Sequence, residues 1–534
     1  MTFIQTIQTK FSSVVPLGTR GRVSSFSIGQ KDLKEVISFL LDGGFRLITM
    51  AGEDERQTKN RFTISYIFGF PKENRFVSLV LSVDPANPVF PSVADVLFSA
   101  RLFGLEIMDM FGLTPEGHPD IELTAQEDGK ERRLVHHHNW PKGEYPLRKD
   151  FSWNKRPEEA NVEFPFLAYS REEGVFEIPV GPIHAGVIEP GHFRFTAVGE
   201  MILHLKIRLF YTHRGVEKLF EQKPLDEAVK LAECVAGDSS FSHSLAFCEA
   251  AEDLAGIKIS RRAGLLRVIF LEMERLYNHA GDIGMIGADA SFAFAGAQGG
   301  RLKEILMRAN ERLSGSRVLR GLNAIGGLKK DTLEENLLWL ASFLGAFERD
   351  FEEFVEVLLA SSSLLDRLET AGRLKTKTAL DYNTVGYVAR ASGLKRDARS
   401  DFPNEFWAGI NFKVPVFETG DVFARFMVRI EEARQSVGII KEALMQMPKG
   451  ESIFSSQPVK FEEGASAIGI VEGWRGEIAY YVVAGQNNTL RRVKVRDASF
   501  LNWPTLPRAI LNNIVPDFPL CNKSYDMSYA GNDL

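Results

Sequence analysis

The chain has 534 residues, 44% of them apolar and 25% charged, which is the composition of an ordinary globular protein rather than a disordered or fibrous one. This length exceeds what a single compact core usually supports, so two or three domains are expected. The formal net charge of −6 and the absence of any long basic run argue against nucleic-acid binding.

The amino-terminal residues 1–19 lack the apolar core and the small-residue cleavage site of a secretory signal, so a cytoplasmic location is expected. The apolar stretches are interrupted by charges before they reach the roughly 18 residues that a membrane span requires. Only three cysteines occur, Cys234, Cys248 and Cys521, and no Cys-x-x-Cys pair is among them. They are expected to be small buried apolar side chains rather than disulfides or thiolate ligands.

The first predicted domain spans residues 1–150 and mixes strands with helices. Residues 31–41 have the pattern of a helix, and residues 75–83 alternate like a strand. A polar, proline-containing stretch at residues 151–171 is expected to be a linker.

The second predicted domain spans residues 172–534 and is mainly helical, because apolar residues recur there at three- and four-residue spacing. Residues 331–368 are expected to form one helix, with a capping box formed by Thr332 and Glu335. Helical patterns also cover residues 202–230, 241–256, 259–286, 298–313 and 421–445. Near the carboxyl end the pattern changes to strands at 465–471 and 478–483, and Gln486-Asn487-Asn488 forms a turn before 491–495. The fold class predicted for the chain is therefore α+β, with a β-hairpin near the carboxyl terminus.

The motifs that carry a family resemblance are Phe103–Gly112, Gly117–Asp120 and Tyr145–Phe151 in the first domain, and Gly181–His184, Glu189–Arg194, His213–Lys218, Gly420–Arg425, Arg475–Glu477 and Asp517–Leu520 in the second. Those of the first domain resemble the small, C-type component of the peripheral arm of respiratory complex I. Those of the second resemble the D-type component of complex I, which carries the quinone site, and, more closely, the large subunit of group 4 nickel-iron hydrogenases of the formate hydrogenlyase and hydrogenase-4 type. In these hydrogenases the two modules are fused in the same order.

In the family, two pairs of cysteine thiolates hold a nickel-iron centre. The resemblance places these four positions at Ala236, Ser239, Ser528 and Gly531. Alanine and glycine have no donor atom, and serine is a hard donor that suits soft low-valent metals poorly. A nickel-iron site and hydrogen activation are therefore predicted to be absent.

Asp238, Asp526 and the two serines are chemically suited to a hard ion such as magnesium or calcium. The favoured interpretation is that these polar groups line or seal the vacated cavity.

In complex I the equivalent cavity receives a quinone headgroup between a histidine and a tyrosine. The resemblance makes His184 or His192 the candidate histidine, and the alternative is that His192 fixes its loop by hydrogen bonds to the backbone. No tyrosine stands between Tyr211 and Tyr277, so half of the quinone anchor is missing from the expected place.

In the hydrogenases the glutamate of the Arg-Gly-x-Glu motif passes protons to the metal site, and Arg214 and Glu217 preserve that motif. A buried carboxylate beside Arg214 is expected to have a perturbed pKa suited to proton transfer or conformational coupling, and a simple Arg214–Glu217 ion pair is the alternative. His243 and Asp238 are weaker candidates for the same polar path.

A dense group of charges at residues 390–401 is expected to make ion pairs or to dock an iron-sulfur partner. It comprises Arg390, Arg396, Asp397, Arg399 and Asp401.

The resemblance implies a peripheral subunit of a redox complex on the cytoplasmic face of a membrane. The implied partners are an iron-sulfur subunit, of the complex I B type or the hydrogenase small-subunit type, and membrane subunits that translocate ions. No cofactor is expected in this chain itself, with iron-sulfur clusters in the partner and a quinone as a candidate acceptor. Two functions stay open: electron transfer to a quinone-like acceptor coupled to ion translocation, or a non-catalytic scaffold that couples protons or conformational change.

Overall fold

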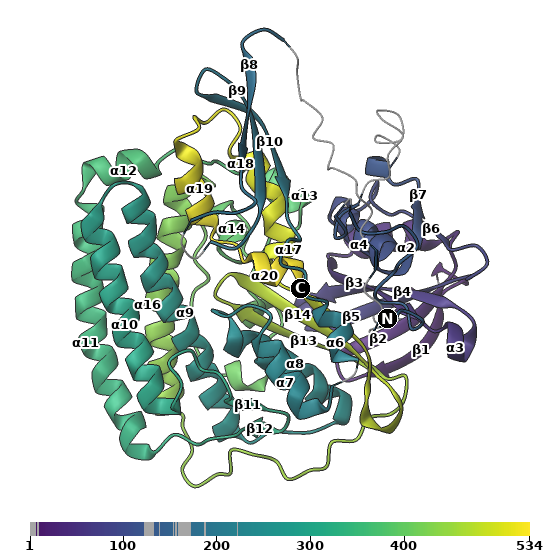
Figure 1. The fold of residues 1–534 in the computed structure, drawn as a ribbon. Helices are drawn as coiled ribbons and strands as arrows, with labels where there is room; N and C mark the ends of the chain where they lie inside the picture. The colour runs from purple at the N-terminus through teal and green to yellow at the C-terminus, as the bar shows by residue number, and fades with distance from the viewer. Residues whose placement is uncertain are drawn as a thin grey trace.

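The computed structural model describes residues 7, 10–121, 133–137, 139–152, 154, 157–158, 172–185, 188–221 and 223–534. Most of the predicted linker at residues 151–171 lies outside these ranges. The mixed α+β class is confirmed, because a sheet domain at the amino end precedes a larger helical part (Figure 1).

The first domain is built on a five-stranded sheet in the order β1-β2-β5-β4-β3, in which only the β2–β5 pair is parallel. The predicted helix at 31–41 is α2 and the predicted strand at 75–83 is β5, so both predictions are confirmed. The strands are β1 Val15–Arg20, β2 Val23–Ile28, β3 Arg46–Asp54, β4 Phe62–Phe70, β5 Arg75–Val83, β6 Val89–Pro91 and β7 Thr114–Glu116, and the helices are α2 Leu33–Asp42, α3 Arg56–Lys59 and α4 Arg101–Phe111.

A second sheet near the carboxyl end consists of β13 Ser466–Gly473, β14 Gly476–Ala484 and β15 Leu490–Arg496, all antiparallel. The predicted hairpin is present and gains β15 as a third strand. Between β14 and β15 the chain turns at Gln486–Asn488, where Asn487 and Asn488 take left-handed conformations with φ of 53° and 61°. Asparagine tolerates this backbone region better than most residues.

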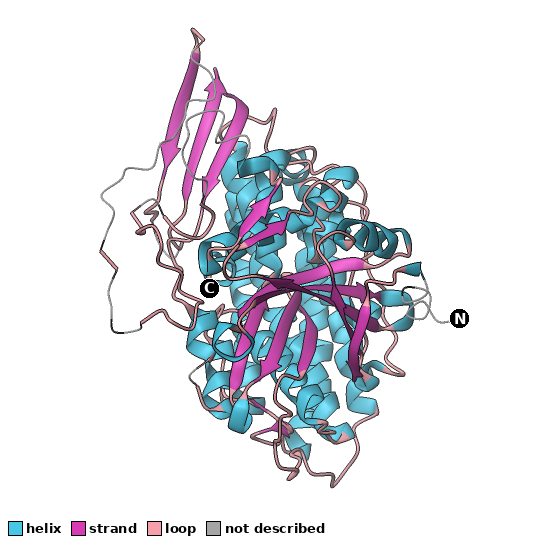
Figure 2. Ribbon diagram, turned by 90° about the vertical axis from the view of Figure 1, so that its right-hand side faces the viewer, coloured by secondary structure: helices cyan, strands magenta, loops and turns pink. Residues whose placement is uncertain are grey.

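The two sheets adjoin one another and join the two parts of the chain (Figure 2). One buried apolar cluster contains residues of both sheets together with Ala398 and Phe402. At the edge of the first sheet, Arg496 Nε donates to the Ile48 carbonyl at 3.1 Å, and Arg492 Nε donates to the Gly52 carbonyl at 2.8 Å. The first domain therefore packs on the second through a shared buried apolar core rather than through a few surface contacts.

Long amphipathic helices form the bulk of the second part (Figure 1). They pack around α9, whose residues are buried along nearly its whole length because neighbours cover it on several sides. The helices are α6 Val216–Phe220, α7 Leu225–Glu233, α8 Ser240–Ala255, α9 Arg261–Asp289, α10 Ala293–Ser314, α11 Glu334–Leu359, α12 Ser362–Leu368, α13 Thr376–Asp381, α14 Gly386–Ala391, α15 Ala398–Asp401 and α16 Val422–Met445.

Two glycines set the close approach of α9 and α10. A Cβ atom on Gly299 would lie 2.6 Å from Gly284 Cα, and one on Gly284 would lie 2.8 Å from Gly299 Cα. Any larger residue at either position would push the two helices apart.

The helix predicted at 331–368 is two helices in the structure, and the predicted capping box is wrong. Helix α11 begins at Glu334 after Leu333, which makes no side-chain cap, and it ends at Leu359. Ser361 then accepts a hydrogen bond from the Leu364 amide at 3.4 Å and starts α12. The serine cap interrupts an apolar pattern that continues across both helices.

The remaining elements bring the carboxyl terminus into the interior and raise a three-stranded sheet above the helices (Figure 1). The last residue, Leu534, is buried. In the part of the chain that the structure describes, no helix combines the length and apolar character needed to cross a bilayer. These elements are β8 Val175–Val180, β9 His192–Val198, β10 Met201–Arg208, β11 Asn323–Ala324, β12 Gly327–Leu328, α17 Ala498–Asn502, α18 Leu506–Ala509, α19 Asp517–Tyr525 and α20 Tyr529–Asp533.

Candidate functional site

Arg214 joins the segment around Ala236 to the segment around Gly531, although nearly 300 residues separate them along the chain. One of its terminal nitrogens donates to the carbonyls of Val235 at 2.9 Å and Ala530 at 3.1 Å, and the other donates to the Cys234 carbonyl at 2.8 Å. Because a guanidinium carries five donors in a rigid fork, it can bridge several backbone carbonyls at once.

A second arginine makes a similar bridge from the β13–β14 turn. The two terminal nitrogens of Arg475 donate to the Asp238 carboxylate at 2.6 and 2.7 Å, and its Nε donates to the Asp526 carbonyl at 2.5 Å. Asp238, a weaker candidate for the polar path, is therefore the partner of a nearly buried arginine.

The four positions of the predicted ligand set lie in these two segments. Ala236 is buried, and Ser239 Oγ lies 3.1 Å from Asp238 Oδ1. Ser528 Oγ accepts a hydrogen bond from the Gly531 amide at 2.8 Å and so caps α20.

At Gly531 the space for a side chain is already filled by Asp497. A Cβ atom added to Gly531 would lie 2.8 Å from Asp497 Cγ. The Asp497 carboxylate therefore occupies the space into which a side chain at position 531 would extend.

Asp497 belongs to a buried polar chain that includes His243. Its Oδ2 lies 3.0 Å from His243 Nε2, and His243 Nδ1 lies 3.0 Å from Tyr480 Oη. Burial raises the pKa of Asp497, but the His243 hydrogen bond and charge, together with the Ser499 amide and Arg475, bring that pKa down to about 2. An ionised carboxylate is therefore fixed in the interior.

Two carboxylates next to this site share a proton in a way that the sequence did not suggest. Burial raises the pKa of Asp282 to about 8, and the neighbouring Asp526 raises it as well, while Arg429 opposes the shift. Asp526 stays ionised, because Lys523 and Arg475 hold its pKa below the ordinary value despite burial. At neutral pH the pair carries one proton.

Glu217 does not pair with Arg214, so the predicted Arg214–Glu217 ion pair is wrong. Its carboxylate lies 2.7 Å from Arg492 and 3.1 Å from Lys494, both on β15, and accepts from the Val495 amide at 2.9 Å. Burial raises the pKa of Glu217, but Arg492 and Lys494 lower it to a value below the ordinary one. The predicted perturbation is present, with partners other than the one predicted.

His184 and His192 stabilise the loop between β8 and β9. His184 Nε2 lies 2.7 Å from the Gly191 carbonyl, and His192 Nδ1 lies 3.2 Å from the Gly181 carbonyl. The loop-fixing contact considered for His192 is thus present.

The same loop contacts the carboxyl-terminal segment. Glu189 accepts from the Ala530 amide at 2.9 Å, and a Cβ on Gly191 would lie 2.5 Å from Tyr529 Cε1. Tyr529 therefore stands beside the histidine loop, although it is far along the chain from the place where the family resemblance led us to expect a tyrosine.

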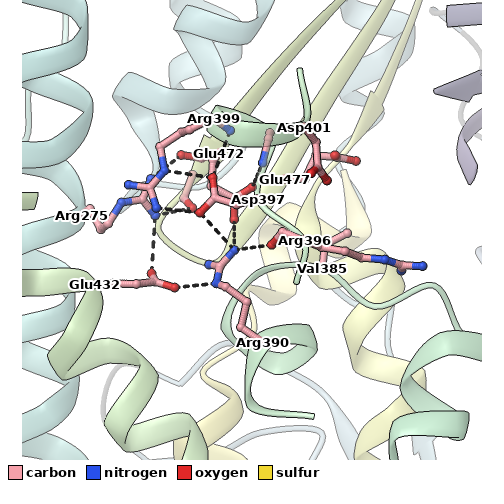
Figure 3. Close-up of polar contacts among 12 residues, drawn as sticks. Arg275, Val385, Arg390, Arg396, Asp397, Arg399, Asp401, Glu432, Glu472 and Glu477 are labelled. Carbon is pink, nitrogen blue, oxygen red and sulfur yellow. Dashed lines mark hydrogen bonds and ion pairs between the residues drawn. The ribbon is translucent and has the colours of Figure 1, made fainter. Parts of the chain in front are cut away.

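The charges at residues 390–401 form buried ion pairs rather than a docking surface. In Figure 3, Arg390, Asp397 and Arg399 point toward carboxylates and guanidinium groups of other elements. Arg390 Nε lies 2.6 Å from Glu432, and Arg390 NH1 lies 2.8 Å from Glu472. The ion-pair prediction is confirmed, but Arg390, Asp397 and Arg399 are too deeply buried to meet a partner protein.

The two outer members of this charge group have separate partners. Arg396 donates to Asn383 Oδ1 at 2.8 Å, and Asp401 pairs with Arg46 at 3.5 Å.

The three cysteines lie apart from one another in the sequence and differ in exposure. Cys248 and Cys521 are buried as predicted, whereas Cys234 is exposed, contrary to the prediction. Among the described residues, no group of three or more His, Cys, Asp or Glu side chains is placed to hold a metal ion.

Comparisons with known proteins agree with this architecture. A family model described as the respiratory-chain NADH dehydrogenase 49 Kd subunit matches residues 286–467 and 454–533, and the 30 Kd subunit model matches residues 26–157. Formate hydrogenlyase subunit 5 of Escherichia coli (strain K12) is 34% identical over 511 residues, which cover 94% of this chain and 87% of the relative.

One further relative and one solved structure are also similar to this chain. The C/D subunit of NADH-quinone oxidoreductase from Phocaeicola vulgatus is 26% identical over 81% of this chain and 85% of its own length. A chain in the structure of the membrane-bound sulfane sulfur reductase (MBS), an archaeal respiratory membrane complex, has the same fold, with a TM-score of 0.64 and 24% identity over 68% of this chain and 100% of that one. The protein therefore belongs to the family of complex I-like and membrane hydrogenase subunits in which a 30 Kd-like domain precedes a 49 Kd-like domain.

Proposed function

We propose that this protein is a peripheral-arm subunit of a membrane-associated complex I-like redox complex that works without a nickel-iron centre. The names of its relatives support the first part, because they are subunits of formate hydrogenlyase, of a membrane-bound hydrogenase and of NADH-quinone oxidoreductase. The side chains at the four ligand positions support the second part.

Those side chains do not fit a nickel-iron centre. Ala236 and Gly531 have no donor atom, and the Ser528 hydroxyl is engaged as a helix cap. Asp497 fills the space beside Gly531, and its hard oxygen atoms are poor ligands for a soft low-valent metal. This donor set is the observation that carries the proposal.

In the proposed complex, electrons come from iron-sulfur clusters in a partner subunit, of the complex I B type or the hydrogenase small-subunit type. Membrane subunits translocate ions, and this chain lies at the cytoplasmic face between them. This chain binds no cofactor permanently.

A quinone-like molecule is the proposed electron acceptor, and the placement of Tyr529 favours it. The ring of Tyr529 lies against Gly191, the residue that precedes His192. A tyrosine and a histidine can each donate a hydrogen bond to a quinone oxygen. The alternative is a scaffold that couples protons or conformational change and reduces nothing.

The metal prediction is tested by isolating the native complex through an affinity tag on this chain and measuring its metals. We expect iron from the clusters of the partner and no stoichiometric nickel. One nickel per chain would overturn the ligand argument.

The acceptor prediction is tested by measuring quinone reduction in complexes that carry Tyr529→Phe or His192→Ala. Tyr66→Phe is the matched control, because Tyr66 is fully buried in the core of the first domain. If electrons reach a quinone beside the loop, Tyr529→Phe lowers the rate and Tyr66→Phe does not. Equal rates in all variants would favour the scaffold.

A further inference from the structure

A small pocket of mixed polar and apolar lining lies where the first domain meets the second. It is lined by residues of α4 and of α6, by the segment before α6 and by the carboxyl terminus, with an empty volume of about 300 Å³. Its polar lining includes Glu106, Glu217, His213, Lys218 and Asp533.

One lysine connects the two glutamates of this pocket. Lys494 Nζ on β15 lies 2.5 Å from Glu106 Oε1 and 3.1 Å from Glu217 Oε1. Glu106 comes from the first domain, whereas Glu217 and Lys494 come from the second. The ion pairs therefore join the two domains through a single buried ammonium group.

The carboxylates of Glu106 and Glu217 differ in their hydrogen-bond partners. Glu217 has Arg492 and the Val495 amide as partners in addition to Lys494. Glu106 Oε2 is buried and has no hydrogen-bond partner among the described residues. Hydrogen bonds to a carboxylate stabilise its ionised form, so this difference separates the proton affinities of the two groups.

We propose that Glu106 and Glu217 act as one proton-holding pair joined through Lys494, in which Glu106 binds and releases the proton and Glu217 stays ionised. The proton leaves Glu106 Oε2 for water in the pocket, and the resulting carboxylate stays paired with Lys494. This proposal rests on the proton-coupling alternative in the proposed function, extends the role expected for Glu217 from the family resemblance, and adds a residue of the first domain to it.

The electrostatic surroundings agree with this division of roles. Burial raises the pKa of Glu106, Lys494 lowers it, and the negative charge of Glu217 raises it again, with a net shift upward. For Glu217 the opposing cations outweigh burial, and the net shift of its pKa is downward.

The other charged groups around the pocket are engaged with partners of their own. His213 Nδ1 lies 2.6 Å from the Asp533 carbonyl, and Lys218 and Lys149 both pair with Glu221. Asp533 accepts from the Thr212 hydroxyl at 2.7 Å. None of these groups is among the principal charges that shift the pKa of Glu106, which are Lys494, Glu217 and Arg492.

The test is a pH titration of the purified full-length protein in which infrared difference spectroscopy records the carboxyl stretching bands. Glu106→Gln should remove one carboxyl that titrates above the ordinary range of glutamate. Glu217→Gln should move that titration to lower pH by roughly one unit, because a neighbouring negative charge is gone. Lys494→Met should move it to higher pH, because the paired cation is gone.

Glu249→Gln is the matched control, since burial also raises the pKa of Glu249, to about 7, and Glu249 lies outside this pocket. This substitution should remove the carboxyl band of Glu249 and leave the titration of Glu106 unchanged.

The proposal is overturned if Glu106→Gln removes no such band, or if Glu217→Gln leaves the titration at the same pH. Circular dichroism and urea unfolding of each variant verify the fold, and the two glutamine variants decide the question even if Lys494→Met does not fold. Because this readout needs neither a partner nor an acceptor, its failure is distinct from a failure of the proposed redox role.

Discussion

Replacing Gly531 with cysteine should destabilise the protein, even though it restores one expected metal ligand. The new Cβ would lie 2.8 Å from Asp497 Cγ and within 3.1 Å of both carboxylate oxygens. Asp497 cannot rotate away freely, because Oδ2 contacts His243 and Oδ1 accepts from the Ser499 amide at 2.7 Å.

The cost has two parts. Forcing an extra group into a packed interior costs about 1–3 kcal/mol. Displacing Asp497 also weakens its hydrogen bond with His243, and a bond to a charged group contributes about 1.5–3 kcal/mol. We therefore expect Gly531→Cys to lower the free energy of unfolding by about 2.5–6 kcal/mol.

Urea unfolding under reducing conditions, followed by circular dichroism, measures this loss as a lower transition midpoint. Gly300→Cys is the matched control, because a Cβ on this exposed glycine of α10 meets no atom within 4 Å. The double variant Asp497→Ala/Gly531→Cys should lose less stability than the sum of its single variants, since the clash is removed. A Gly531→Cys protein as stable as the unaltered one would refute this explanation of the site.

Two further predictions concern buried charges. Glu432→Gln removes a buried partner of Arg390 and His279 and should cost about 3–5 kcal/mol in urea unfolding. Glu352→Gln breaks a partly exposed pair between α11 and Arg434 of α16, the helix that carries Glu432, and should cost about 1 kcal/mol or less; equal losses would contradict the role assigned to burial. For pH dependence, burial raises the pKa of Glu249 from 4.5 to about 7, so its contribution to stability is fully present below about pH 4.5 and is lost as pH rises through about 7. Glu249→Gln should therefore stabilise the protein relative to the unaltered one at pH 8, by at most about 3 kcal/mol, with little effect at pH 4.5. If Glu249→Gln has the same effect on the free energy of urea unfolding at pH 4.5 and pH 8, the Glu249 carboxyl is not held in its neutral form.

Much of the architecture could be predicted from the sequence, because alternating and helical apolar patterns report local structure directly. The helix at 31–41 and the strand at 75–83 were predicted in this way, as were most of the packed helices of the second part. The helical pattern at 202–230 was wrong at its start, because residues 201–208 form strand β10. The prediction failed at 331–368, where an apolar stripe continues across a break made by the Ser361 cap. Periodicity reports which face is buried and is insensitive to a short interruption of the backbone.

The candidate site was also predicted only in part from the sequence. The predicted absence of two thiolate ligands rests on the identity of Ala236 and Gly531 alone, since no fold can supply a donor atom that the side chain lacks. Proximity along the chain, however, wrongly suggested Arg214 as the partner of Glu217.

Only the tertiary structure decided the partners. Strand β15 supplies Arg492 and Lys494 to Glu217, nearly 280 residues away, and the start of α17 supplies Asp497 beside Gly531. The charges at residues 390–401 resemble a surface cluster in the sequence, yet Arg390 is fully buried because carboxylates from α16 and β13 pair with it. The residue types determined which donor atoms are present at the candidate site, whereas packing between distant elements determined which charges meet, because electrostatic pairing depends on distance in space and not on separation along the chain.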